Sequence, residues 1–251
     1  MKRMASMGFA AVLAVALNAA PTRAEHGDVG RYYDAGREDD TAPITTTWWD
    51  VLPREEADAA IAADRHYIEG MRPHHAGALT LAKGYLADPE ARNPVLRRLA
   101  GSILRNQAFE ILLLDTVGEQ VRQPPVPLFG GLVLRPVAVE GLGQSRRILH
   151  TPGPGPLALL NGGAPTTETD LRFAKEMRVH HAAAVRMARN YNAGAEARNN
   201  FLRLMNVNIV TDQTQEIAIM DRVLAAHPRR AAAITVDPAS IPGMEHMMGG
   251  K

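Results

Sequence analysis

The sequence predicts an all-α protein whose body is a four-helix bundle made of two repeated helical hairpins. The motif Met-Arg-x-His-His-Ala-x-Ala occurs twice, beginning at Met71 and again at Met177, which is 106 residues later (177 − 71). Aligning 64–115 on 170–221 needs no gap and matches about 21 of 52 positions, and such self-similarity indicates a duplicated supersecondary unit. Two amphipathic hairpins can bury their apolar stripes against each other, which gives the bundle.

The N-terminus is typical of an exported protein. Residues 1–24 combine a basic start, a short apolar run and small residues around Ala24, so they are expected to be a cleaved signal peptide. The mature chain would then begin at Glu25 in the periplasm or as a secreted protein. No later stretch reaches the roughly 18 to 20 apolar residues of a membrane span, so none is predicted. Residues 25–52 show no clean period and are expected to be an irregular N-terminal arm.

The first hairpin is predicted over 53–120. Pro53 followed by acidic residues is typical of a helix start. Pro73 lies inside this helix and is expected to kink or split it, because proline lacks the N–H that the helix needs. Asn93 followed by Pro94 predicts the cap and first turn of the second helix.

A long crossover is predicted between the hairpins, over 121–165. Eight prolines among many glycines exclude helix for most of it, and its apolar content favours a strap over a bundle rather than a free linker. Such a crossover gives the bundle a ferritin-like connection. The second hairpin is predicted over 166–228. A capping box at Thr167 begins its first helix, and Asn199 caps its second helix. Residues 229–251 are expected to form a mobile tail that contains Met and His.

Composition narrows the chemistry. The 28 basic and 27 acidic residues nearly cancel, so nucleic acid is not an expected partner. With no cysteine, the chain has no disulfide, thiolate ligand or cysteine nucleophile. Soft-metal ligation must therefore come from its 11 methionines and 9 histidines.

These residues gather in three places. Each His-His pair follows a methionine by three and four residues, which places all three on one helical face. The second copy also has Met187, Met205 and Met220 where the first has leucines, an exchange that core packing alone can explain. A further cluster closes the chain, with Met244, His246, Met247 and Met248. Thioether and imidazole donors suit copper, and Cu(I) above all, better than zinc, iron or magnesium.

In each hairpin, one glutamate interrupts the apolar stripe of the second helix. Glu110 and Glu216 are expected to point inward, where an unpartnered carboxylate would cost several kcal/mol, of order 2–7 for a buried polar group. An arginine, a histidine or a metal could partner them. An ion pair with Arg72 or Arg178 that locks the bundle is the favoured interpretation.

The Met-x-x-His-His-x-x-Ala block, followed about thirty residues later by Gln-x-x-Glu-Ile, resembles the domain-of-unknown-function 305 family. The resemblance covers about 55–120 and 166–227, as two copies. It implies a ferritin-like helical bundle, usually exported, with some members binding copper through methionine and histidine. On that pattern the candidate ligands are Met71, His74, His75, Met177, His180, His181, Met187 and Met220.

Three functions follow, in order of preference. The first is an extracytoplasmic copper-binding protein without turnover, for sequestration or for transfer to another periplasmic copper protein, and it contributes to copper homeostasis or resistance. The second is a metal-free helical bundle that binds a partner. The third is a ferritin-like dimetal oxidase, which needs Glu-x-x-His spacings on paired helices. Residue 69 is Glu but Arg72 follows three on, and Glu176 is followed by Val179, so no catalytic residues are predicted.

Overall fold

The computed structural model describes residues 52–135, 153–154 and 165–245. The predicted signal peptide, nearly all of the predicted N-terminal arm, most of the crossover after residue 135 and the candidate ligands His246, Met247 and Met248 lie outside the described residues.

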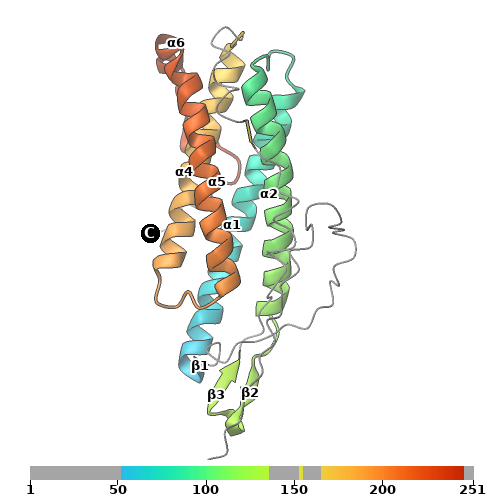
Figure 1. Cartoon of the computed structure of the whole chain (residues 1–251), viewed down its shortest axis with the longest axis vertical. Helices are drawn as coiled ribbons and strands as arrows, with labels where there is room; N and C mark the ends of the chain where they lie inside the picture. Colours follow the sequence, from blue (N-terminus) through green and yellow to red (C-terminus); the bar gives the residue numbers. More distant parts are fainter. Residues whose placement is uncertain (1–51, 136–152, 155–164, 246–251) are drawn as a thin grey trace, which may run out of the picture. The chain divides into compact units, whose positions relative to one another are not determined.

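Four long helices form the two predicted hairpins (Figure 1). The first pairs α1 (Arg54–Ala87) with α2 (Pro94–Val121), and the second pairs α4 (Glu168–Ala193) with α5 (Asn200–Ala225). The hairpins meet through α1 and α4. These two helices run antiparallel, because the end of α1 contacts the start of α4 and the end of α4 contacts the first half of α1. The all-α four-helix arrangement of two packed hairpins is therefore confirmed.

The helix starts follow from their caps. Asn93 accepts hydrogen bonds from the main-chain N–H groups of Val95 and Leu96, and Asn199 does the same for the second hairpin. Thr167 and Asp170 form the predicted capping box, each side chain accepting from the other's main-chain N–H. These side chains satisfy N–H groups that have no partner inside the helix, which fixes where each helix begins.

Pro73 does not split α1, which runs without interruption from Arg54 to Ala87. Of the two expected outcomes, a kink or a split, the split was wrong. Pro73 removes one intrahelical hydrogen bond, but the residues on both sides of it, Met71 and His74, are fully buried against the other helices. Tertiary packing therefore holds the helix together across the missing bond.

A small antiparallel sheet lies at the start of α1 and was not predicted. Its strands are β1 (Leu52–Pro53), β2 (Val126–Leu128) and β3 (Val133–Arg135), in the order β1-β3-β2. Leu52 pairs with Leu134, and both are buried, so the sheet joins the start of the first hairpin to the chain that follows its second helix. Farther along, Gly153 lies beside Ser102 of α2.

Two hydrophobic clusters fill the bundle, one toward each end, and each takes residues from all four long helices. One cluster is built around Leu96, Leu99, Leu171 and Met177, and the other around Met71, Leu114, Leu202 and Ile209. Between them, each helix contributes polar residues, which are buried except for the partly buried Glu110. We call this set the polar layer; it comprises His74, His75, Gln107, Glu110, His180, His181, Gln213 and Glu216.

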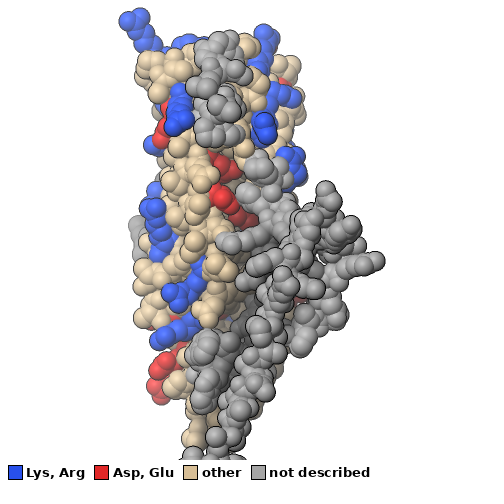
Figure 2. Space-filling model, in the orientation of Figure 1, with Lys and Arg blue, Asp and Glu red and all other residues tan. Residues whose placement is uncertain are grey.

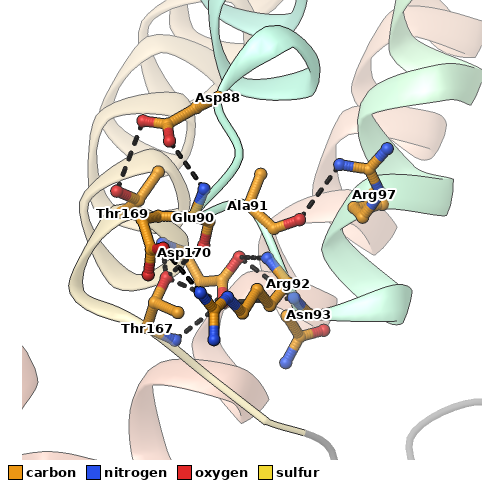
Figure 3. A network of polar contacts seen from close by, with 9 residues as sticks. All are labelled: Asp88, Glu90, Ala91, Arg92, Asn93, Arg97, Thr167, Thr169 and Asp170. Carbon is orange, nitrogen blue, oxygen red and sulfur yellow. Dashed lines mark hydrogen bonds and ion pairs between the residues drawn. The ribbon is translucent and has the colours of Figure 1, made fainter.

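Buried tyrosine–aspartate contacts tie α1 to α4 on both sides of the polar layer. Tyr85 donates to Asp170 at 2.6 Å, and Tyr191 donates to Asp64 at 2.5 Å. Figure 3 shows the Asp170 end, where the carboxylate also accepts the main-chain N–H groups of Arg92, Asn93 and Thr167. The loop between α1 and α2 is thereby fastened to the start of α4.

The described surface is mixed in charge. Figure 2 shows lysine and arginine side chains spread over the drawn face of the helices, with acidic side chains between them. Within the described ranges, every helix is too short or too polar to cross a membrane.

A buried histidine layer as candidate metal centre

The four histidines of the repeated motif meet where α1 crosses α4. The rings of His74 and His180 are in contact, with centroids 3.7 Å apart and ring planes tilted by 38°. His180 Nε2 donates to the main-chain carbonyl of His74 at 2.9 Å. His75 and His181 follow on the same helices, with ring centroids 6.3 Å and 6.2 Å from their neighbours. All four imidazoles are completely buried.

The outer two histidines pair with the two inward glutamates. His75 Nε2 lies 3.0 Å from Glu110 Oε2, and His181 Nε2 lies 2.6 Å from Glu216 Oε2. The favoured expectation of an Arg–Glu lock was therefore wrong. Arg72 and Arg178 instead pair with Asp115 and Asp221, the last matched positions of the repeat, at half-exposed sites where a long side chain keeps its charge in water.

These hydrogen bonds fix which ring nitrogen carries the proton. A carboxylate or carbonyl oxygen can only accept, so Nε2 is the donor in neutral His75, His180 and His181. Their Nδ1 atoms are then unprotonated and present a lone pair. Among the described residues, the buried Nδ1 atoms of all four histidines have no hydrogen-bond partner.

Burial keeps three of these rings neutral. Desolvation, and after it the charges of the neighbouring histidines, lowers the pKa of His180 and of His181 to about 3. The pKa of His74 is also well below its ordinary value, again through burial and then through the other three histidines. Neutral imidazole is the form that ligates metals.

Two glutamines add to the unpartnered polar atoms. Gln107 and Gln213 each lie one turn before the glutamate of their helix, on the same face. Both are buried, and neither the amide nitrogen nor the oxygen of either has a partner among the described residues. Because native interiors satisfy nearly all buried polar groups, so many unpartnered atoms in one layer call for a bound species.

The predicted methionine ligands of the helices lie in the hydrophobic clusters on the two sides of the layer or, for Met187, at a pocket. Met71 and Met177 are fully buried on opposite sides of it, one in each hydrophobic cluster, and Met220 shares the cluster of Met177. Met187 is half-buried and lines a pocket of about 590 Å³ that Tyr67 and Tyr191 also line. Its methyl group would lie 3.1 Å from a Cβ placed on Gly70.

Met244 packs against the helical bundle. It is 3% exposed and packs with Ile241 against Ala183 of α4. The expectation of a mobile tail was wrong for the residues up to 245, because buried apolar side chains anchor them. A Pro/Gly-rich composition favours turns but does not by itself exclude docking.

Sequence analysis missed several residues that position this centre. Asp64 and Asp170, Tyr85 and Tyr191 were identical pairs in the repeat, but only the structure shows that each tyrosine reaches the aspartate of the other copy. Within the described parts of the chain, no three His, Asp or Glu side chains converge as a cation site of that composition would need.

The fold and the buried layer together define a class of protein: a duplicated-hairpin four-helix bundle with an imidazole–carboxylate layer across its core. The sequence model of a family described as a domain of unknown function, DUF305, matches residues 49–125 and 170–251. The chain belongs to this family. No curated protein and no solved structure matches it.

Proposed function

We propose that this protein binds copper ions outside the cytoplasm, with Cu(I) favoured, and that it sequesters them or passes them to another copper protein. The observation that carries the proposal is the set of four buried imidazoles whose Nδ1 atoms have no partner among the described residues. Such atoms are costly to bury without a hydrogen-bond partner or a bound ion, and in His75, His180 and His181 the Nδ1 atom presents a lone pair to one.

The hydrogen bonds of the outer histidines fit a metal-binding role. In many metal sites a ligating histidine donates its other ring N–H to a carboxylate, which orients the ring and raises its basicity. Glu110 and Glu216 stand in that relation to His75 and His181. Because the bond engages Nε2, the atom left for a metal is Nδ1.

The neighbouring side chains favour a soft ion. Met71 and Met177 are buried one turn before His75 and His181, so thioether and imidazole donors alternate on each helix. Copper(I) accepts both donor types and tolerates low coordination numbers in apolar surroundings, whereas Zn²⁺ and Mg²⁺ favour sets with more thiolate or oxygen.

The remaining predictions agree with a carrier and not a catalyst. The expected signal peptide would place the protein in the periplasm or outside the cell, where methionine ligands cannot be lost to disulfides. We propose no reaction. A metal-free bundle that binds a partner is the alternative if copper does not bind.

The decisive experiment is an anaerobic titration of the chain from Glu25 with Cu(I) against a chromophoric chelator. The double variants His74→Ala/His75→Ala and His180→Ala/His181→Ala should each weaken binding at least 100-fold. The control is His66→Ala, because His66 lies on α1 but is exposed and outside the layer. Circular dichroism would show whether each variant keeps its helices.

Two further variants separate the donors. Met71→Leu and Met177→Leu keep apolar volume, so they should leave the fold intact and weaken Cu(I) binding if the thioethers ligate.

A chain that ends at Gly243 tests the tail. If this chain alone loses binding, the tail and not the layer holds copper; if no form of the protein competes with the chelator, the copper proposal is wrong.

A further inference from the structure

Residues 234–245 lie against the two helices that carry the histidine layer. We call residues 234–245 the C-terminal strap. The hydrophobic cluster that holds Ile241 and Met244 also contains Ala183 of α4, and Val179 of α4 and Leu81 of α1 pack against it. The strap therefore lies in the groove between α1 and α4, on the side where the two histidine motifs cross.

Two glycines show how close the strap comes to the motif. A Cβ placed on Gly77 would lie 2.0 Å from the carbonyl oxygen of Pro242. A Cβ on Gly243 would lie 2.9 Å from the carbonyl oxygen of His74, and Gly243 has a φ of +80°. This carbonyl is the one that accepts the His180 ring N–H. The strap thus covers the backbone that holds the His74–His180 pair.

The strap contacts the two copies of the motif at equivalent positions. Gly77 and Ala183 occupy the same place in the two copies of the motif (77 + 106 = 183), the variable position after His-His-Ala. One contacts Pro242 and the other lies in the cluster of Ile241 and Met244. The two smallest residue types therefore stand where the strap passes from one motif to the other.

The strap is fixed at one end and held by apolar packing along the rest. Lys175 of α4 donates to the carbonyls of Ala231 and Ile234, both at 2.6 Å. Beyond this anchor, the hydrogen bonds of residues 237–244 to other described residues stay within the strap. A segment held only by a few buried side chains can lift without breaking a hydrogen-bond ladder.

We propose that the C-terminal strap is the gate of the histidine layer: when it lifts about its Lys175 anchor, the groove between α1 and α4 opens and the buried imidazoles become reachable. This inference rests on the proposed function for its cargo, since a carrier with fully buried ligands needs a route for the ion. The gate itself can be tested without metal.

The test uses two glycine-to-alanine changes on the same helix. Gly77→Ala places a methyl group where Pro242 lies and must displace the strap. Gly84→Ala is the matched control, because a Cβ there meets nothing within 4 Å. Alanine favours helix at both positions, so neither change should weaken α1 itself. A chain that ends at Ala233 removes the strap altogether.

The metal-free readout is modification by diethyl pyrocarbonate, which attacks unprotonated imidazole, followed by peptide mass mapping. Modification of His74 and His180 should rise at least tenfold in Gly77→Ala and in the chain ending at Ala233, and should stay at the wild-type level in Gly84→Ala. Exposed His66 provides the internal standard. Circular dichroism must show the same helix content in all four proteins.

The second readout is the rate at which Cu(I) passes from the loaded protein to a chelator. It should rise at least tenfold in Gly77→Ala and remain unchanged in Gly84→Ala. Unchanged modification of the layer in Gly77→Ala would overturn the gate, even if the truncated chain were more reactive, because truncation alone can loosen the packing. Increased modification in a protein that binds no Cu(I) would uphold the gate and reject the proposed cargo.

Discussion

The two hairpins make the same polar contacts at the centre of the bundle and different ones at their ends. His75–Glu110 and His181–Glu216 are counterparts, as are Arg72–Asp115 and Arg178–Asp221. At the ends, Asp170 accepts three main-chain N–H groups, whereas Asp64 accepts from two side chains of the described residues, Tyr191 and Asn199.

The strap adds a second difference between the halves. It packs beside Lys175 of the second hairpin, and the position that matches Lys175 in the first hairpin is Glu69, which lines the pocket with Met187. Duplication of the sequence therefore repeated the layer but not its surroundings. Lys175 and Glu69 differ at a position where one copy meets the strap and the other lines a pocket.

Acid should produce the largest effect, and it should act on both copies through the shared layer. Because the pKa values of folded His180 and His181 are about 3, the unfolded chain binds more protons between about pH 3 and 6.5, so stability falls as pH falls. At pH 4.5 the two together should lower the free energy of unfolding by about 5 kcal/mol relative to pH 7.

Asp64 opposes this loss. Burial raises its pKa to about 6 from 3.8, so the folded state holds this proton more tightly and the aspartate restores about 2 kcal/mol on acidification to pH 4.5. Urea unfolding of metal-free protein from pH 7 to 4.5 measures the balance. His180→Gln should flatten the curve and Asp64→Asn should steepen it; a curve that neither variant changes would contradict the assignment.

Loss of the buried aspartate should lower the free energy of unfolding by different amounts at the two ends of the bundle. Asp170→Ala leaves three main-chain N–H groups, one of them buried and two partly buried, and the Tyr85 hydroxyl without their acceptor, so it should cost about 4 kcal/mol. Asp64→Ala removes a carboxylate whose burial is already unfavourable and should cost roughly 1 kcal/mol at pH 7. Equal losses in urea unfolding would show that the main-chain contacts do not matter.

Much of this architecture could be predicted from the sequence, for local reasons. The caps at Asn93, Thr167 and Asn199 act within a few residues, and the repeat aligned the hairpins directly. The histidines of the layer were candidates because their spacing places them on one helical face. The contact between the His74 and His180 rings was not predictable, since it depends on how α1 crosses α4.

The errors have a common physical origin in long-range packing. Pro73 was expected to kink or split its helix, and the split does not occur because buried neighbours on both sides hold the helix together. Glu110 and Glu216 were expected to meet arginine, but the arginines of the motif lie at the surface. The strap was expected to be mobile, since nothing local in a Pro/Gly sequence reveals that Gly77, over 160 residues earlier (243 − 77 = 166), leaves room for it.

The carboxylates of the layer offer a test of whether copper uses one copy or both. Glu110→Gln and Glu216→Gln keep an oxygen that can accept the histidine N–H but remove its charge. By analogy with other carboxylate–histidine–metal sites, each should weaken Cu(I) binding about 10- to 100-fold. Equal effects in the chelator titration indicate a site shared by the two hairpins. An effect of Glu216→Gln alone would place copper in the second hairpin, and no effect of either would exclude these histidines as ligands.

The surface ion pairs should give the smallest effects and the closest agreement between the copies. The side chains of Arg72 and Asp115 are 47% and 41% exposed, and those of Arg178 and Asp221 are 44% and 43% exposed. Exposed pairs of this kind contribute roughly 0–1 kcal/mol, less at high salt. Asp115→Asn and Asp221→Asn should therefore each lower the free energy of unfolding by under about 1 kcal/mol, and by the same amount within about 0.3 kcal/mol. A larger loss for one of them in urea unfolding at low and high salt would mean that its arginine also holds a segment outside its own hairpin.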